Sequence, residues 1–184
     1  MGIDPTIVQN VAERMRAEVL PRATPPAAPA LRLDPAIIQK IAQKVPIFAG
    51  MGQAALLATL ATGEHFSVQT GEAVFREGDM GNSFYVLIAG DVAVEKQRDG
   101  RPVELKRLGP GECFGEMALV GNDVRSATVR ALGPVVAMRF YRELIDSHPE
   151  GASTIYRNIA RILAARLGES SVMLADLKQR DTAA

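Results

Sequence analysis

Residues 111–119 read GECFGEMAL, and after five further positions residues 125–129 read RSATV. The stretch 124–132 is rich in β-branched residues, contains neither Gly nor Pro, and predicts a strand. Alternation along that strand places Arg125 on the same face as three small apolar residues, Ala127, Val129 and Ala131. A guanidinium on such a face needs an anionic partner and several acceptors, because burying an unpaired charge is costly.

The glycine at position 115 predicts a short helical turn over Glu116–Leu119. Free main-chain N–H groups at a helix start attract anions. A fork-shaped guanidinium beside them, that of Arg125, can bind one phosphate through two nitrogens. Glu116 lies too close to this predicted site to be a surface charge, and a carboxylate there can accept a sugar hydroxyl.

The region from 66 to 140 consists of short apolar runs that alternate with glycine-containing turns. This sequence pattern is typical of many short antiparallel strands in a roll or sandwich. Within it, residues 103–106 alternate as a half-buried strand should. Helices are expected on both sides of this region, a short one over Gln53–Ala61 and a long one that begins at Pro149 and ends near Leu177.

Two segments near the N-terminus share one start signal and one apolar stripe. Asp4-Pro5 and Asp34-Pro35 both look like a helix cap followed by Pro at the first helical position. The two stripes have the same spacing and consist of Ile7, Val8, Val11, Ala12 and Met15, and of Ile37, Ile38, Ile41, Ala42 and Val45. We hypothesise that the first helix competes for the groove of the second, in its own chain or in a partner protomer. The alternative is two ordinary amphipathic helices that are alike by chance.

The expected organisation has four parts: an arm helix over 1–20, a Pro- and Ala-rich linker over 21–32, a roll with its leading helices over 33–140, and C-terminal helices over 141–184. The long C-terminal helix carries a seam at alternating spacings of four and three, as in a coiled coil. Its members are Tyr156, Ala160, Leu163, Leu167, Ser170, Leu174 and Leu177. This seam predicts a homodimer through that helix.

Composition excludes several classes of function. The chain has 184 residues, of which 47% are hydrophobic, enough for one globular domain with appendages. Its 21 basic and 21 acidic residues cancel, so it has no general attraction to nucleic acid. The single cysteine, Cys113, excludes an intrachain disulfide and fits a reducing cytosol. No apolar run is long enough to span a bilayer. We therefore expect a cytoplasmic protein with neither a nucleic-acid nor a membrane partner.

Residues 114–119 together with Arg125-Ser126-Ala127 resemble the phosphate-binding cassette of cyclic-nucleotide-binding domains. Such domains occur in catabolite-activator-type regulators, kinase regulatory subunits and nucleotide-gated channels. The upstream run 78–85, GDMGNSFY, with Gly90 is similar to the second motif of the family. The resemblance covers about residues 34–178. It implies a mainly β fold with flanking helices (α+β): an antiparallel, jelly-roll-like β-roll of about eight strands, with N-terminal helices and a long C-terminal helix.

By this resemblance, Arg125 binds the cyclic phosphate and Glu116 the ribose 2′-hydroxyl. Main-chain N–H groups around Gly115, Ser126 and Ala127 would complete the phosphate site. Ser170 and Ser171 fall where hydroxyl residues of the long helix contact the purine in catabolite-activator-type proteins. The candidate ligand-binding residues are Phe114, Gly115, Glu116, Met117, Ala118, Arg125, Ser126, Ala127, Val103, Leu105, Ser170 and Ser171. We expect no catalytic residue, no metal and no cofactor besides the ligand.

These observations predict a non-enzymatic sensor that binds cyclic AMP and signals through its flanking helices to an unidentified protein partner. A cyclic-GMP-selective sensor stays open, because a hydroxyl residue directly after the cassette arginine, here Ser126, contacts guanine in some relatives. A dimerisation domain that binds no ligand is a further alternative. A transcription factor would need a C-terminal recognition helix and a basic face. A phosphodiesterase would need metal ligands, and His65 and His148 are too isolated to supply them.

Overall fold

A computed structural model of the chain describes residues 40–41, 43–121 and 123–182. The chain divides into two compact units, Met1–Leu33 and Asp34–Ala184, and every described residue belongs to the second. The expected arm helix and linker, and most of the helix after Asp34-Pro35, therefore lie outside the described residues. The end of that helix is described: residues 40, 41, 43 and 44 are helical, and Pro46 begins a separate 3-10 helix, η1 (Pro46–Phe48).

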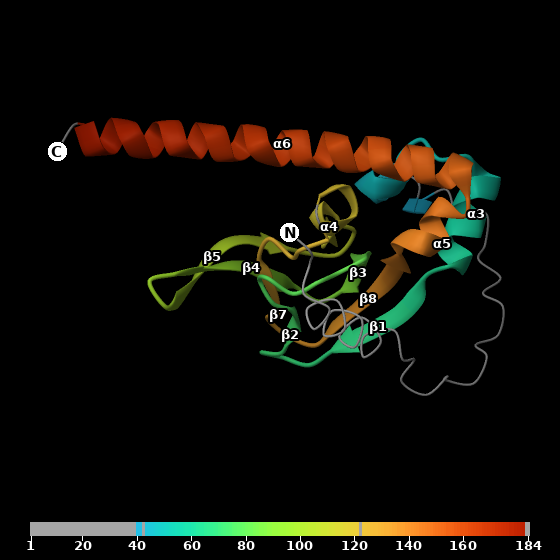
Figure 1. The fold of residues 1–184 in the computed structure, drawn as a ribbon, viewed down its shortest axis with the longest axis horizontal. Helices are drawn as coiled ribbons and strands as arrows, with labels where there is room; N and C mark the ends of the chain where they lie inside the picture. The colour runs from blue at the N-terminus through green and yellow to red at the C-terminus, as the bar shows by residue number, and fades with distance from the viewer. Residues whose placement is uncertain (1–39, 42, 122, 183–184) are drawn as a thin grey trace, which may run out of the picture. The chain divides into compact units, whose positions relative to one another are not determined.

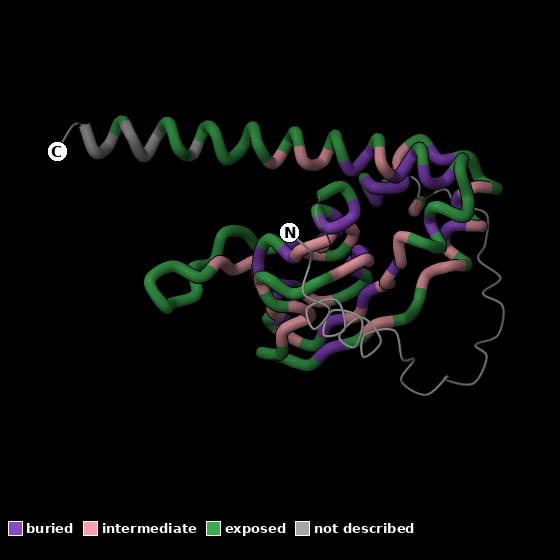
Figure 2. The backbone as a smooth tube through the Cα atoms, in the orientation of Figure 1, coloured by how far each residue is buried: buried purple, intermediate pink, exposed green. Residues whose placement is uncertain are grey.

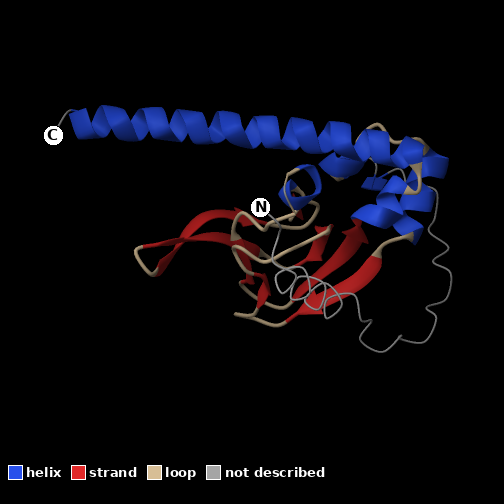
Figure 3. Cartoon of the chain, viewed as in Figure 1, coloured by secondary structure: helices blue, strands red, loops and turns tan. Residues whose placement is uncertain are grey.

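Two antiparallel sheets form the body of this unit, and they contain eight strands within the part of the chain that the structure describes (Figure 3). One sheet has the order β1-β8-β3-β6 and the other the order β2-β7-β4-β5. The strands are β1 (Glu64–Val68), β2 (Ala73–Phe75), β3 (Ser83–Ala89), β4 (Val92–Arg98), β5 (Arg101–Leu108), β6 (Cys113–Phe114), β7 (Thr128–Ala131) and β8 (Val135–Tyr141). The expected mainly β fold of about eight strands with flanking helices is confirmed.

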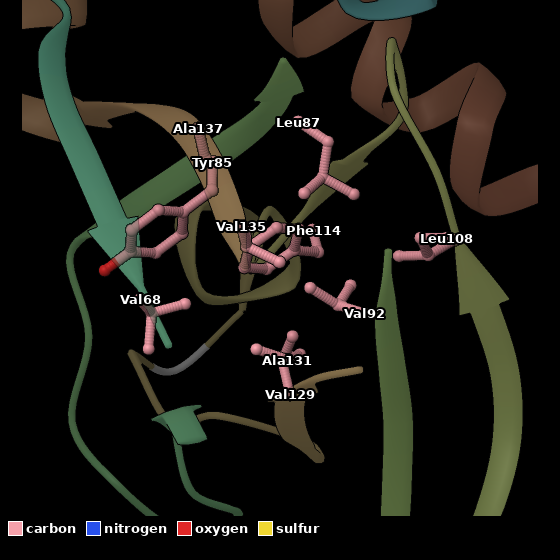
Figure 4. Packing of buried hydrophobic residues seen from close by; sticks show 10 residues of the cluster. All are labelled: Val68, Tyr85, Leu87, Val92, Leu108, Phe114, Val129, Ala131, Val135 and Ala137. Atoms are coloured by element: carbon pink, nitrogen blue, oxygen red, sulfur yellow. The ribbon is translucent and has the colours of Figure 1, made fainter. Parts of the chain in front are cut away.

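The roll core lies between the two sheets, where their inward side chains meet (Figure 4). Its centre is aromatic, because the rings of Tyr85 and Phe114 stack with centroids 5.0 Å apart. Gly90, at φ +80°, allows the chain to pass tightly beside β8, since a Cβ there would lie 2.3 Å from the Pro134 carbonyl oxygen. The buried members of the cluster are Val68, Tyr85, Leu87, Val92, Leu108, Phe114, Val129, Ala131, Val135 and Ala137.

Besides the helix end at residues 40–44, of which 42 is not described, the sheets are accompanied in the described residues by α3 (Gln53–Ala61), α4 (Met117–Val120), α5 (Arg142–Asp146) and α6 (Pro149–Thr182). Helix α3 has the predicted bounds, whereas α6 continues past the expected end (Figure 1). The first turns of α6 pack on η1 through the fully buried Ile155 and Ile159. Asn158 of the same face donates to two η1-region carbonyl oxygens, those of Ile47 (3.1 Å) and Ala49 (2.8 Å). None of the described helices is both long and apolar enough to cross a membrane.

Two strand predictions are wrong in detail. The strand expected over 124–132 begins only at Thr128, because the main chain of Arg125 bonds to the 78–79 turn instead of a neighbouring strand. The expectation that 103–106 form a half-buried strand also fails, since every residue of β5 before Leu108 is exposed (Figure 2). β5 is the edge strand of its sheet and pairs only with β4. β4 in turn pairs with β7 only over Val92–Glu95, so the tip of the β4–β5 hairpin extends beyond the rest of the sheet.

Candidate ligand-binding site

The two motifs singled out in the sequence meet through main-chain hydrogen bonds. The Arg125 N–H donates to the Asp79 carbonyl oxygen (2.8 Å), and the Gly78 N–H donates to the Arg125 carbonyl oxygen (2.9 Å). The turn at Gly78 and Asp79, at the start of the 78–85 motif, therefore holds the backbone of Arg125, which belongs to the other motif. We call residues 114–127 the cassette.

The Arg125 side chain is 4% exposed and is held on several sides. Its Nη1 donates to the carbonyl oxygens of Ser83 (2.7 Å) and Gly115 (2.9 Å), and its Nη2 to the Ser83 hydroxyl (3.2 Å). Its Cζ lies 4.2 Å from the centroid of the Phe75 ring, a cation–π distance. The predicted burial of Arg125 is confirmed, but the residue precedes β7, so strand alternation is not its cause. Neutral acceptors and an aromatic face contact its head group.

Two glycines make room for this guanidinium. A Cβ on Gly81 would lie 2.2 Å from Arg125 Nε, and one on Gly115 would lie 2.7 Å from Nη1. Gly115 also has φ +80°, a conformation that side chains other than glycine rarely adopt. Gly81 of one motif and Gly115 of the other therefore have a common function, which is to allow the close approach of Arg125.

The cassette turn follows directly from Gly115. Ala118 and Leu119 of α4 are buried and anchor it, whereas Met117 is 46% exposed. The Ser126 hydroxyl lies 3.2 Å from the Met117 sulfur, so these two predicted ligand residues are neighbours on the exposed side of the cassette. Within the described part of the chain, the main-chain N–H groups of Ser126 and Ala127 make no hydrogen bond.

Glu116 is 1% exposed and forms an ion pair with Nη1 of Arg166, a residue of α6. Nη2 of Arg166 also donates to the Cys113 carbonyl oxygen (2.8 Å). Burial raises the pKa of the Glu116 carboxyl, and the positive charges of Arg166 and Arg125 oppose this rise. Arg166 is absent from the residues predicted from the sequence. Its position one helical turn before Ser170 is a signal that could have found it.

The remaining predicted residues lie elsewhere. The Phe114 ring is in the roll core, and Val103 and Leu105 are exposed on β5 at 44% and 56%. Ser170 and Ser171 are exposed on α6, and their hydroxyls donate to the carbonyl oxygens of Arg166 (2.9 Å) and Leu167 (2.8 Å) of their own helix. The structure thus brings together Gly115, Glu116, Met117, Ala118, Arg125, Ser126 and Ala127.

Neither a reactive thiol nor a metal site lies near the cassette in the described part of the chain. Cys113 is 4% exposed, and burial raises the pKa of its thiol to about 12, which keeps it protonated and unreactive. No cluster of His, Cys, Asp and Glu side chains suited to a metal ion occurs among residues 40–41, 43–121 and 123–182. The site therefore consists of a buried guanidinium, a buried carboxylate and a short turn, a set suited to a phosphate beside a sugar.

Comparison with known proteins agrees with this class of site. Residues 65–147 match the family model of the cyclic nucleotide-binding domain. The chain is 28% identical over 141 residues to a CRP-like cAMP-activated global transcriptional regulator of Mycobacterium tuberculosis, covering 76% of this chain and 63% of the regulator. It is 41% identical over 133 residues to Glutaminase 2 of Bradyrhizobium diazoefficiens, covering 64% of this chain and 20% of that enzyme.

Among solved structures, the catabolite activator protein of Thermus thermophilus superposes with a TM-score of 0.65 at 29% identity, covering 72% of this chain and 63% of that one. The chain spans less than two thirds of the length of each of these three relatives. Its similarity to regulators of the CRP type therefore concerns the cyclic nucleotide-binding domain, and the aligned region contains no evident DNA-binding domain.

Proposed function

We propose that this chain is a regulatory module that binds cyclic AMP at the cassette and transmits binding through α5 and α6 to a protein partner. The observation that carries the proposal is the buried Arg125 guanidinium, whose Nη1 donates to the carbonyl oxygen of Gly115, the residue directly before the buried carboxylate of Glu116. The similarity to a cAMP-activated regulator supports cyclic AMP as the ligand. The single cysteine of the chain suggests a cytoplasmic setting.

Each part of the ligand has a matching group in the cassette. The cyclic phosphate would pair with the Arg125 guanidinium and accept hydrogen bonds from the main-chain N–H groups of Ser126 and Ala127. The ribose 2′-hydroxyl would donate to the Glu116 carboxylate. Met117 and Ser126, neighbours on the exposed side, would face the base or the sugar.

Contacts between the cassette and the helices offer a route for the signal. Arg166 of α6 shares the Glu116 carboxylate that the ribose would use, so ligand binding changes the partners of α6. A second contact joins β5 to α6, where Lys106 Nζ and Glu169 Oε2 form an ion pair at 3.1 Å. At the start of α5, the Arg142 N–H donates to the Asn82 carbonyl oxygen (2.8 Å), within the 78–85 motif. We therefore expect the positions of α5 and α6 to depend on ligand.

The outer face of α6 supports a homodimer. Leu167 and Leu174 are 69% and 59% exposed, and they are seven residues apart, the repeat of a coiled coil. Leucines this exposed on one helix face favour a partner helix that would cover them. A second copy of this chain supplies the same seam.

Titration calorimetry of the whole chain with cyclic AMP and cyclic GMP tests the proposal. We expect cyclic AMP to bind more tightly than cyclic GMP, and Arg125→Lys to bind either poorly, because an ammonium cannot replace the planar fork. Tighter binding of cyclic GMP would reassign the ligand. An absence of binding to both nucleotides would leave the ligand-independent dimerisation domain as the better interpretation.

Two further measurements refine the assignment. Glu116→Gln should discriminate less than wild type against 2′-deoxy cyclic AMP, since the carboxylate is the group that accepts the 2′-hydroxyl. An equal loss of affinity in both proteins would show that Glu116 does not hold it. Chromatography of the nucleotide after incubation should recover it intact, as expected of a sensor that is not an enzyme.

A further inference from the structure

Two arginines converge on one buried hydroxyl beneath the cassette. Ser83, the first residue of β3, is fully buried. Its Oγ accepts hydrogen bonds from Arg125 Nη2 (3.2 Å) and from Nε of Arg139, a residue of β8 (3.1 Å). A serine hydroxyl has two acceptor positions, and here each of them is taken by a guanidinium.

Arg139 is itself held in place by aromatic rings. Its Cζ lies 4.4 Å from the centroid of the Tyr141 ring and 5.7 Å from that of Tyr85. Tyr85 is also the residue opposite Arg139 across the β3–β8 ladder, so the side chains share a face of the sheet. Strand pairing and ring contacts therefore fix where the Arg139 Nε–H points.

We propose that Ser83 and Arg139 are positioning residues for Arg125, with Arg139 acting through the Ser83 hydroxyl. The inference rests on the proposed function, in that it assigns residues that prepare the phosphate site. Without Arg139 the hydroxyl could rotate about its Cα–Cβ bond. With Nε–H bonded to it, the hydroxyl keeps its acceptor directed at Arg125 Nη2.

The gain is preorganisation of the phosphate-binding group. Ser83 bonds Arg125 twice, through its carbonyl oxygen (2.7 Å) and its hydroxyl (3.2 Å). A guanidinium held in its bound orientation loses little side-chain freedom when the ligand arrives, which raises affinity. Removing the hydroxyl, or the group that orients it, should therefore weaken binding of the cyclic phosphate while the roll stays folded.

Cyclic AMP titration of three variants tests this assignment. Ser83→Ala should bind about tenfold more weakly than wild type, the loss expected for a hydrogen bond to a charged group. Arg139→Lys keeps the positive charge but loses the planar Nε–H, and it should also bind at least about threefold more weakly. The double variant should bind about as weakly as Ser83→Ala alone, because Arg139 acts through that hydroxyl.

Arg130→Lys is the matched control. Arg130 is a half-buried strand arginine that bonds Glu95 and the Gly71 carbonyl oxygen, and it should tolerate the same substitution without loss of affinity. Urea unfolding of each variant shows that the fold is retained. Wild-type affinity in Ser83→Ala or in Arg139→Lys overturns the proposal, as does a double variant whose losses multiply.

A measurement on the free protein separates this inference from the proposed function. In ¹⁵N spectra of the guanidinium groups, exchange of the Arg139 Nε–H with water should be several-fold faster in Ser83→Ala than in wild type. If wild type binds no cyclic nucleotide, the proposed function fails, and this spectrum alone decides whether Ser83 holds Arg139. Unchanged exchange contradicts the inference.

Discussion

Arg166 of α6 and Glu116 of the cassette form an ion pair although they are 50 positions apart in the sequence. The carboxylate is 1% exposed on its side chain, and the guanidinium 27%. Under the proposed function this carboxylate would accept the ribose 2′-hydroxyl, so one contact would link ligand binding to the position of α6.

Arg166→Ala should lower the free energy of unfolding by about 1–3 kcal/mol at neutral pH. The variant leaves the buried Glu116 carboxylate without its guanidinium, and a buried charged acceptor that loses its partner is costly. Lys106→Ala is the control, because it breaks an exposed ion pair to the same helix and should cost less than about 1 kcal/mol. Urea unfolding measures both. Equal losses in the two variants would contradict a special role for the buried pair.

The pH dependence of stability should report Glu116. Burial raises the pKa of this carboxyl above its ordinary value of 4.5, so between the two values the native state keeps a proton that the unfolded state has released. Stability therefore falls as the pH rises through that window, and the loss is complete above the raised pKa. Glu116→Gln has no titratable group at this position, so its free energy of unfolding should increase relative to that of wild type from pH 4.5 upward. Parallel pH profiles in urea unfolding would be the contrary result.

Gly81→Ala should weaken cyclic AMP binding by about tenfold or more without unfolding the roll. The added Cβ would lie 2.2 Å from Arg125 Nε, and the flexible end of the arginine is what can move. A displaced guanidinium loses much of its interaction with the phosphate. Gly133→Ala is the control, because nothing lies within 4 Å of its Cβ position. Calorimetry that finds both variants equal to wild type would show that Arg125 needs no such space.

The seam of α6 should hold a dimer that charge can break. Leu163→Asp combined with Leu167→Asp should give a monomer by light scattering, because two carboxylates would face two others across the helix pair. Ala165→Asp with Val172→Asp adds the same charge to the opposite face, where both residues are exposed, and should leave the dimer intact. A wild-type protein that is monomeric at high concentration would rule out this seam.

Much of the fold follows from local patterns in the sequence. Short apolar runs between glycine turns predict the roll, and α3 has the bounds that its pattern predicts. The cassette could be identified in the same way, since Gly115, Glu116 and Arg125 lie within eleven consecutive positions. Conformational preferences of a few neighbouring residues decide such features, and the order of residues is enough to reveal them.

The contacts that prepare the site depend on the tertiary structure. Arg166 reaches Glu116 from α6, and Arg139 reaches Ser83 from 56 positions away. Long polar side chains of this kind have no periodic pattern, and their partners are set by which strands and helices pack together. The exposure of Val103 and Leu105 has the same origin: their alternation is that of a half-buried strand, but an edge position leaves both faces of β5 in solvent. By itself the sequence determined which groups could bind a phosphate and a sugar, because local geometry brings them together. Only the packing of distant elements decided how those groups are held, because that depends on distances between residues far apart in the chain.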